Sequence, residues 1–441
     1  MSLLERQFAL AANGTTVRTE VLAGITTFMT MAYIVFVQPA VLSAAGMDFG
    51  AVMVATCLST AFATLLMGLT ANYPIGVAPA MGHNFFFAYS VVLGMQVPWQ
   101  VALGAVFIAG AIFVVTAGFG LRELAITAIP SSLKHGIAAG IGLLIAMIGF
   151  QWSGVIVGAP GTLVAIGDLR HPPVLLALFG LLVTAALVVR RVPGAFLWGI
   201  GTSTAVGLAS GLVTFGGVAS WPPSIAPTAF ALDITGALSP AMWPVVLVFF
   251  FLALFDSVGT LVGVGQQAGL MRNGTLPRAR QAFLADAVGT MAGATLGTST
   301  VTAYIESASG VAAGGRTGLA SVVTAVMFLL ALFFHPLVRT IGGGIPSESA
   351  TLYPIIAPPL ILVGTMMIGG LQQVAWDDPT EAIPTFLTVI VMPFTVSITE
   401  GVAFGLIAYV ALKLIAGRRH EVHPVLLVFA AMFLARYAFL V

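Results

Sequence analysis

The chain has 441 residues, of which 59% are hydrophobic and only 7% are charged, and its mean hydropathy is +1.08. Soluble domains carry roughly 25% charged residues, so this composition excludes a soluble protein and predicts an all-α polytopic membrane protein. The formal net charge of +1 argues against nucleic acid as a partner, and the single cysteine, Cys57, cannot form an internal disulfide.

Runs of mostly apolar residues, each about the 20 residues that cross a bilayer as a helix, follow one another along the chain and predict about fourteen spans. In chain order the predicted spans cover 20–43, 51–72, 74–95, 99–119, 132–151, 173–190, 194–214, 241–266, 281–296, 298–314, 317–338, 351–373, 382–399 and 401–417. A last apolar stretch, 422–441, is either an additional span or a helix lying at the membrane surface.

Ten basic residues in four groups fall on one side of this arrangement, and an excess of Lys and Arg marks the cytoplasmic side. The N-terminus is then cytoplasmic, and it lacks the layout of a cleaved signal. The seventh span ends outside, so the second seven spans start from the opposite face, as in a seven-plus-seven inverted repeat. The basic residues on the cytoplasmic side are Arg122, Lys134, Arg190, Arg191, Arg272, Arg278, Arg280, Lys413, Arg418 and Arg419.

Two predicted spans are interrupted, and they occupy corresponding positions in the two halves. In the third span, Tyr73–Gly94, prolines and glycines crowd before Asn84. In the tenth, within Gly297–Leu319, five glycines and several hydroxyl residues accompany Glu306 and Arg316. Matched interrupted segments are the best sequence pointer to a transporter site, because half-helix ends near the midplane can recognise a polar ligand.

Three acidic residues lie within predicted spans, where a carboxylate costs about 2.5–3.5 kcal/mol on insertion scales. Asp256 lies in the eighth span among phenylalanines and leucines, Asp286 in the ninth and Glu306 in the tenth. Because such residues mark substrate or ion pathways by default, we predict that Asp256 and Glu306 bind substrate or a proton. Asp286 either relays a proton or orients the site. The alternatives are a buried structural hydrogen bond for Asp256 or Asp286, and an ion pair with Arg316 for Glu306.

Other candidates lie beside these acids. The Asn84 amide offers a donor and an acceptor, which suits the edge of a heterocycle, but it could instead cap the broken helix. One ring of the run that begins at Phe85 could stack on a ligand. Tyr304 could stack, donate its hydroxyl, or simply pack.

Catalytic and cofactor motifs are absent from the sequence. There is no GxxxxGK[ST] phosphate loop, no HExxH or cysteine–histidine cluster, and no GxSxG nucleophile elbow. We therefore predict neither an enzyme nor an ATP-driven pump, and no metal or cofactor.

Six stretches, which together span nearly the whole chain, resemble the nucleobase–cation symporter-2 superfamily in its hypoxanthine–adenine–guanine permease branch. They are AGITTFMTMAYIVFVQP (23–39), ANYPIGVAPAMGHNFFFAY (71–89), IPSSLKHGIAAGIGL (129–143), LFDSVGTLVGV (254–264), GTSTVTAYIESASGVAAGGRTGL (297–319) and AIPTFLTVIVMPFTVSITEGVAFG (382–405).

The resemblance implies two inverted seven-span repeats, with short strands in spans 3 and 10. A core domain would comprise residues 1–120 and 241–340, and a gate domain 121–240 and 341–441. The resemblance also implies proton symport and a homodimer formed through the gate domains.

The resemblance further implies which residues hold the base. The acids of spans 8 and 10 that bond the base in related uracil permeases match Asp256 and Glu306. The backbone bonds beside the second acid map to Ile305, and the span-3 asparagine of the purine branch matches Asn84.

We therefore predict a proton-coupled importer of purine nucleobases in the inner or plasma membrane, working by an elevator-like motion of core against gate. Asp256, Glu306 and Ile305 would hold the base together with Asn84, Phe85 and Tyr304. Glu306 is favoured for the proton, with Asp256 and Asp286 as the other candidates. The alternative is an anion transporter of the same fold, against which two carboxylates aimed at one site argue, because like charges repel.

Overall fold

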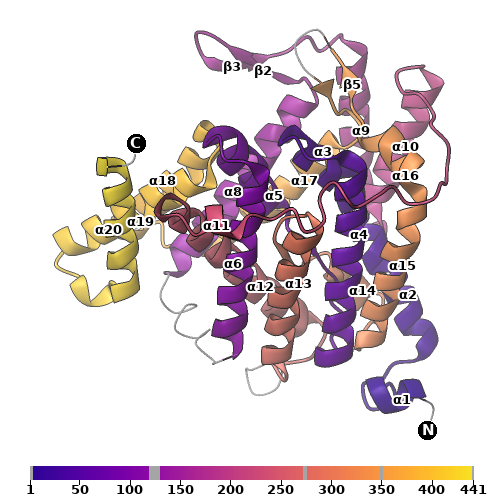
Figure 1. Cartoon of the computed structure of the whole chain (residues 1–441), viewed down its shortest axis with the longest axis horizontal. Coiled ribbons are helices and arrows are strands. Elements are labelled where there is room, and N and C mark those ends of the chain that lie inside the picture. Colours follow the sequence, from indigo (N-terminus) through magenta and orange to yellow (C-terminus); the bar gives the residue numbers. More distant parts are fainter. Residues whose placement is uncertain (1–2, 119–129, 272–275, 348–350, 440–441) are drawn as a thin grey trace.

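The structure, a computed structural model, describes residues 3–118, 130–271, 276–347 and 351–439. Several of its longer helices run side by side across the molecule (Figure 1). Within these ranges, eight helices are long and apolar enough to cross a membrane. The prediction of an all-α polytopic membrane protein is thus confirmed.

The two halves of the chain contain similar sets of elements, and every predicted span coincides with one or more of them. The first half comprises α1 (Leu3–Phe8), α2 (Val17–Met31), α3 (Ile34–Ala44), α4 (Phe49–Leu66), η1 (Met67–Ala71), β1 (Val77–Pro79), α5 (Met81–Phe85), η2 (Phe86–Gly94), α6 (Trp99–Gly118), α8 (Ser131–Trp152), β2 (Ile156–Ala159), β3 (Leu163–Ile166), α9 (Pro172–Val189) and α10 (Ala195–Ala209). The second comprises α11 (Ile234–Ala237), η3 (Pro240–Met242), α12 (Trp243–Gln267), α13 (Ala279–Leu296), β4 (Val301–Ala303), α14 (Ser307–Ala312), α15 (Gly318–Ala331), η4 (Leu332–Phe334), α16 (His335–Gly342), β5 (Ile345–Pro346), β6 (Thr351–Leu352), α17 (Ala357–Ile368), η5 (Gly369–Gln373), α18 (Pro379–Thr395), α19 (Ile398–Ile415), η6 (Arg419–Glu421) and α20 (Pro424–Phe439).

The first predicted span, 20–43, is divided into α2 and α3, which are separated at residues 32–33. Just before the break, the Thr30 hydroxyl donates back to the carbonyls of Thr26 (3.2 Å) and Thr27 (2.9 Å). Such bonds compete with the backbone ladder and often bend helices. The break places a new helix start beside the interrupted segments of the other half.

The two interrupted spans meet at a pair of short strands. β1 pairs antiparallel with β4 over the full length of both strands. The pairing continues past each strand, since the Ala80 amide donates to the Thr300 carbonyl (3.0 Å) and the Tyr304 amide donates to the Gly76 carbonyl (2.9 Å). Pro79 within β1 lacks an N–H and cannot continue a helix. The short strands expected in spans 3 and 10 are confirmed.

Each strand is also held by a threonine of the long helix before it, and the contact is the same in both halves. The Thr64 hydroxyl accepts from the Val77 amide (2.9 Å) and donates to the Val77 carbonyl (3.0 Å). The Thr290 hydroxyl accepts from the Val301 amide (3.3 Å) and donates to the Val301 carbonyl (2.7 Å). This repetition around an antiparallel strand pair is the two-fold relation of an inverted repeat.

The connection from α10 to α11, residues 210–233, is here called the crossing segment. In Figure 1 it runs across the molecule from α10 to α11. The Phe230 amide donates to the Thr295 carbonyl (2.7 Å), and the Asp233 amide donates to the Gln100 carbonyl (2.8 Å). The crossing segment is therefore bonded to the end of α13 and the start of α6.

The C-terminal apolar stretch forms α20, which packs on α19 and buries Leu426 and Phe433. At 16 residues it is shorter than the roughly 20 that cross a bilayer upright. Residues 440–441 lie outside the described ranges.

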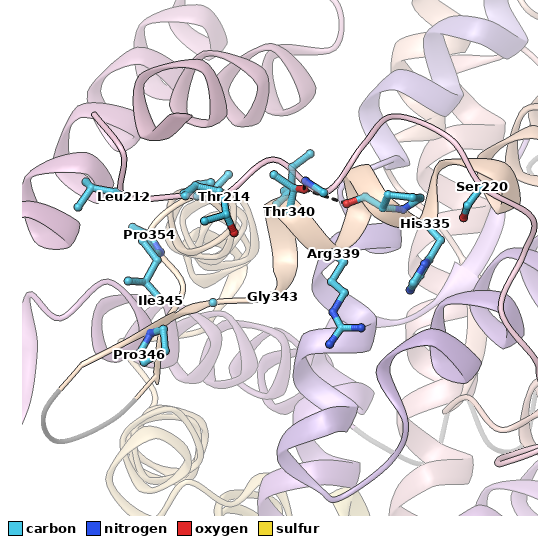
Figure 2. A pocket seen from close by; sticks show the side chains of 16 residues that line it. Leu212, Thr214, Ser220, His335, Arg339, Thr340, Gly343, Ile345, Pro346 and Pro354 are labelled. Atoms are coloured by element: carbon cyan, nitrogen blue, oxygen red, sulfur yellow. Dashed lines mark hydrogen bonds between the residues drawn. The ribbon is translucent and has the colours of Figure 1, made fainter. Parts of the chain in front are cut away.

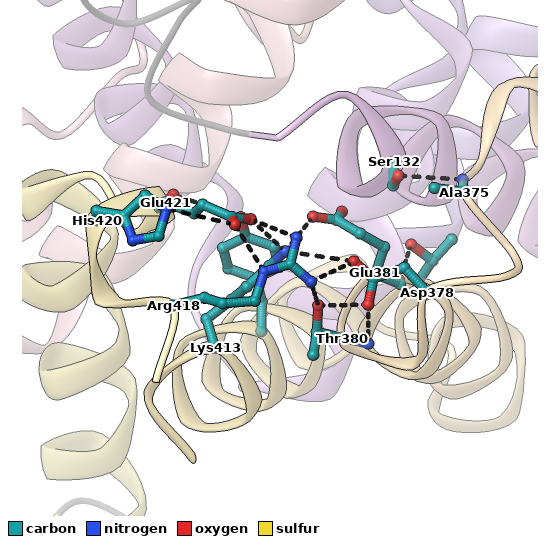
Figure 3. A network of polar contacts seen from close by, with 11 residues as sticks. Ser132, Ala375, Asp378, Thr380, Glu381, Lys413, Arg418, His420 and Glu421 are labelled. Atoms are coloured by element: carbon teal, nitrogen blue, oxygen red, sulfur yellow. Dashed lines mark hydrogen bonds and ion pairs between the residues drawn. The ribbon is translucent and has the colours of Figure 1, made fainter. Parts of the chain in front are cut away.

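A polar network joins the start of α18 to the end of α19 and to the turn before α20 (Figure 3). Lys413, whose side chain is fully buried, lies 2.8 Å from Glu381 and 2.7 Å from Glu421. Arg418 lies 2.6 Å from both Asp378 and Glu421. Three carboxylates and two cations thus surround the point where α20 leaves the bundle.

Candidate functional site

A cavity of about 750 Å³ lies between helices of both halves. Its walls come chiefly from α5, α12 and α14 on one side and from α8 and α17 on the other. The polar residues that line it are Thr30, His83, Lys134, His135, Asp256, Thr260, Glu306, Ser309 and Gln373. Two of the three predicted acids, Asp256 and Glu306, therefore face one shared hollow.

Asp256 lies in the middle of α12, and its side chain is exposed to this cavity. The Thr302 hydroxyl, from β4, donates to Asp256 Oδ2 (3.0 Å). Within the described residues Oδ1 has no partner, so this oxygen is available to a ligand. The strand crossing thus fixes the direction of the carboxylate while one acceptor stays open.

Glu306 stands at the start of α14 and is half-buried at the cavity wall. The Tyr33 hydroxyl, at the break between α2 and α3, donates to Glu306 Oε1 (2.7 Å). The Ser309 hydroxyl donates to the Glu306 backbone carbonyl (2.7 Å), and the Thr30 hydroxyl lies 3.3 Å from the same carbonyl. The ion pair with Arg316 considered from sequence is not found, because that guanidinium donates to the carbonyls of residues 311 and 315.

The two residues before Glu306 have different positions. Ile305 lines the cavity, and 54% of its surface is exposed there. Tyr304 is buried and is not part of the lining; its hydroxyl donates to the Pro79 carbonyl. Tyr304 therefore joins the end of β4 to β1 in this structure.

Asp286, on α13, lies behind the strand pair and is fully buried. Its Oδ2 accepts from the Ala303 amide (3.2 Å), whereas its Oδ1 has no partner in the part of the chain that the structure describes. Asp286 does not line the cavity. Asp286 and Asp256 therefore bond neighbouring residues of β4, Ala303 and Thr302.

Asn84 and Phe85 are not brought to the cavity in this structure. Asn84 is fully buried, and its Oδ1 accepts the hydroxyl of Ser299. The Phe85 ring is also fully buried, between Tyr89 (5.8 Å between ring centroids) and Trp152 (6.0 Å). Both side chains therefore attach α5 to neighbouring segments of the protein.

Sequence reasoning missed the hydroxyl partners of both acids, Tyr33 and Thr302. It also did not place Lys134 and His135 of α8 in the cavity wall, where Lys134 Nζ lies 5.8 Å from the ring centroid of Phe255. Tyr33 lies in the stretch 23–39 that carries the family resemblance, and this could have pointed to a role at the site. Its partner is distant in sequence, so the pairing could not be read from spacing.

A protein-family model described as a permease family matches residues 18–404. The chain belongs to the nucleobase–cation symporter-2 family. A putative permease of Methanocaldococcus jannaschii is 50% identical, covering 100% of this chain and 99% of the relative. An adenine permease of Escherichia coli strain K12 is 45% identical, covering 99% and 96%. A guanine/hypoxanthine permease of Bacillus subtilis strain 168 is 45% identical, covering 97% and 98%.

Among solved structures, the transmembrane domain of a cyanobacterial bicarbonate transporter aligns with a TM-score of 0.63 at 17% identity, covering 87% of this chain and 97% of that one. The anion transporter SLC26A9 of mouse aligns with a TM-score of 0.62 at 13% identity, covering 90% and 68%. At such identities the likeness establishes the fold alone. Members of the nucleobase–cation symporter-2 family are permeases, so the prediction that this chain is not an enzyme is confirmed.

Proposed function

We propose that this chain imports purine nucleobases together with protons, and that the base binds between Asp256 and Glu306. The observation that carries the proposal is the shared cavity, which both carboxylates line. Relatives over nearly the whole chain are named adenine and guanine/hypoxanthine permeases, which supports purines as the substrate class.

The chemistry of a purine edge suits this arrangement. Purines carry ring and exocyclic N–H groups, and the free oxygens of Asp256 and Glu306 are acceptors. Ile305 offers backbone groups at the same wall. For Asn84, Phe85 and Tyr304 we propose a supporting role, in which they hold α5 and the strand pair in place; direct contact would need a rearrangement.

Proton coupling follows from the cost of moving a charge through a low-dielectric site, since a neutral acid is far cheaper to carry. We favour Glu306 as the coupled group because it is the more buried of the two carboxylates in the cavity wall, and burial favours the neutral acid. Asp256 and Asp286 are the alternatives, and the unpartnered oxygen of buried Asp286 is consistent with a proton held there.

The proposed domains are a core of residues 1–120 and 241–340 and a gate of 121–240 and 341–441. Core helices α5, α12 and α14 face gate helices α8 and α17 across the cavity. An elevator-like motion of core against gate would carry the base with its two carboxylates. We further propose an inner or plasma membrane location, a cytoplasmic N-terminus and a homodimer formed through the gate.

The test is uptake of radiolabelled adenine, guanine and hypoxanthine into cells that express Asp256→Asn or Glu306→Gln. We expect uptake to fall about a hundredfold in each, since a hydrogen bond to a charged group contributes about 1.5–3 kcal/mol. Asp168→Asn, at an exposed loop carboxylate, is the matched control. Normal uptake in both site variants, at equal membrane expression, would refute the assignment.

Proton coupling is tested separately in proteoliposomes. An inward-directed proton gradient should drive purine accumulation, and a protonophore should abolish it. If sulfate or bicarbonate, but no purine, were accumulated instead, the anion-transporter alternative would replace this proposal.

A further inference from the structure

A second hollow, of about 680 Å³, lies away from the two carboxylates and is shown in Figure 2. One wall is the beginning of the crossing segment, from Leu212 to Ser220. The other runs from His335 at the start of α16 to Pro346 in β5. None of the residues that line the carboxylate cavity lines this hollow.

Both walls belong to chain segments that lead from one proposed domain towards the other. The crossing segment leads from α10 to the second half, and α16 with β5 leads from α15 towards α17. The two connections are bonded to each other here, since the Gly216 amide donates to the Thr340 hydroxyl (3.2 Å) and the Ser220 amide to the Phe333 carbonyl (2.9 Å). The hollow therefore lies where the two connections meet.

The charge in the hollow is positive. Arg339 and His335 are one helical turn apart and extend to the same side of α16 (Figure 2). The Arg339 side chain is exposed, and among the described residues it has no carboxylate partner. No acidic residue occurs in the described lining. The hydroxyl of Thr214, also in the lining, has no partner within the described ranges.

Exposed aromatic rings occur on the chain segments that form both walls. Trp221 is 86% exposed and lies edge-on to Phe333, with 6.0 Å between ring centroids. Phe215 and Phe334 are exposed on the two connecting segments as well. Trp and other amphipathic aromatic residues gather at the headgroup level of a bilayer. A position of Trp221 at the headgroup level would bring Arg339 near the lipid phosphates.

We propose that this hollow binds a phosphate group, carried either by a phospholipid headgroup or by free phosphate. The Arg339 guanidinium is a planar fork that can bond two phosphate oxygens, and His335 and Thr214 can add donors. Because the walls belong to both connections, the bound group contacts both and holds them in this arrangement. The inference concerns binding and does not depend on what the cavity carries.

The test is thermal unfolding of the purified full-length protein in a neutral detergent, with added short-chain phosphatidylglycerol, phosphatidylcholine or inorganic phosphate. A ligand that binds only the folded state raises the unfolding midpoint. We expect a saturable rise with phosphatidylglycerol that is lost in Arg339→Gln and in Thr214→Glu, which places a carboxylate beside the arginine. Arg170→Gln, another exposed arginine, is the control and should keep the rise.

Comparing the lipids with inorganic phosphate in this assay separates the two sources of the phosphate group. A saturable, Arg339-dependent rise with inorganic phosphate alone assigns the site to free phosphate, and a rise only with lipid assigns it to a headgroup. Equal rises in the wild type and Arg339→Gln, or no rise with any phosphate compound, would overturn the proposal.

Discussion

Each acid in the carboxylate cavity is oriented by one hydroxyl. Thr302 bonds Asp256 and Tyr33 bonds Glu306, and each bond uses one carboxylate oxygen and leaves the other without a protein partner among the described residues. A single donor per acid fixes the direction of the group and preserves its capacity to accept from a ligand. The hydroxyls are therefore part of the proposed site although neither needs to touch the base.

At Tyr33, we expect Tyr33→Phe to weaken purine uptake by raising KM about tenfold or more. The lost hydrogen bond to a carboxylate contributes about 1.5–3 kcal/mol, and about 1.4 kcal/mol corresponds to a factor of ten. The measurement is the initial uptake rate as a function of purine concentration. Tyr353→Phe, whose hydroxyl has no partner in the described residues, should leave KM unchanged; an equal KM in both variants would contradict the role of Tyr33.

The sequence predicted which acids lie at the cavity better than it predicted which neighbouring side chains do. Asp256 and Glu306 were identifiable because a carboxylate in an apolar span is costly and therefore informative. Asn84 and Phe85 were predicted to hold the base, but they do not line the cavity in this structure. Because α5 is five residues long and is followed by a π-helical segment, ordinary helical spacing does not predict which of its sides faces the cavity. Their contacts with Ser299 and Trp152 depend on tertiary structure.

At the scale of elements, the strand pair is the feature that the composition could not reveal. β1 and β4 have three residues each, too few for a recognisable alternating pattern. Prolines and glycines predicted the interruption of the spans, and the strands themselves were expected only from the family resemblance. The helical, membrane-spanning character of the chain, by contrast, was predicted from length and hydropathy, and eight helices in the described residues are long and apolar enough to cross a membrane.

We expect Thr290→Val and Thr64→Val each to lower the thermal unfolding midpoint. Each change removes a side-chain partner of a strand residue's amide and carbonyl, and a buried group left unsatisfied costs about 1–3 kcal/mol. The two variants should be affected similarly because the contacts are equivalent. Thr202→Val, at an exposed helical threonine, is the control; a midpoint unchanged in both strand variants would show that the threonines do not hold the strands.

The network before α20 gives a prediction with a pH dependence. Hydrogen bonds from Thr380 and Arg418 hold the pKa of Asp378 well below its usual range, and Arg418 and Lys413 lower the pKa of Glu421 from 4.5 to about 2. Because the folded-state pKa values are depressed, the stabilisation is fully present above the unfolded pKa and is lost as pH falls through the folded one. For Glu421 this window runs from about 4.5 down to about 2.

Accordingly, Arg418→Gln should unfold at a lower temperature than the wild type at neutral pH. The difference between the two midpoints should shrink as pH falls below about 4.5 and be lost only below about 2, because the pKa of Asp378 is held well below its usual range. Arg419→Gln, in the same turn, serves as control because no carboxylate pairs with it among the described residues. A midpoint difference that stays constant across this window would exclude the network as its cause.

For the whole molecule, the orientation of the cavity is testable. α8 ends next to the β2–β3 hairpin at one face, and its start, which carries Lys134 and His135, points towards the face on which α1 lies (Figure 1). The start of α13, with Arg278 and Arg280, lies on that face too. If that face is cytoplasmic, as the basic residues predict, then the cavity opens inward in this conformation.

Chemical labelling of introduced cysteines tests the side of the membrane to which the cavity opens. In a Cys57→Ala background, Ala138→Cys in the cavity wall should react with an impermeant maleimide in inside-out vesicles, and adenine should slow the reaction. Thr162→Cys, in the hairpin, should react in right-side-out vesicles whether or not adenine is present. Labelling of Ala138→Cys only in right-side-out vesicles would reverse the proposed orientation.

The pairing of β1 with β4 also has a consequence for biogenesis. The two strands lie in opposite halves of the chain, so a ribosome adding about 5–20 residues per second needs on the order of ten to forty seconds to make the second after the first. During that interval β1 lacks its neighbour, and unpaired peptide groups are not tolerated in lipid. Nascent β1 must therefore stay against α4 or inside the insertion machinery, and the carrier becomes competent only after its second half has entered the membrane.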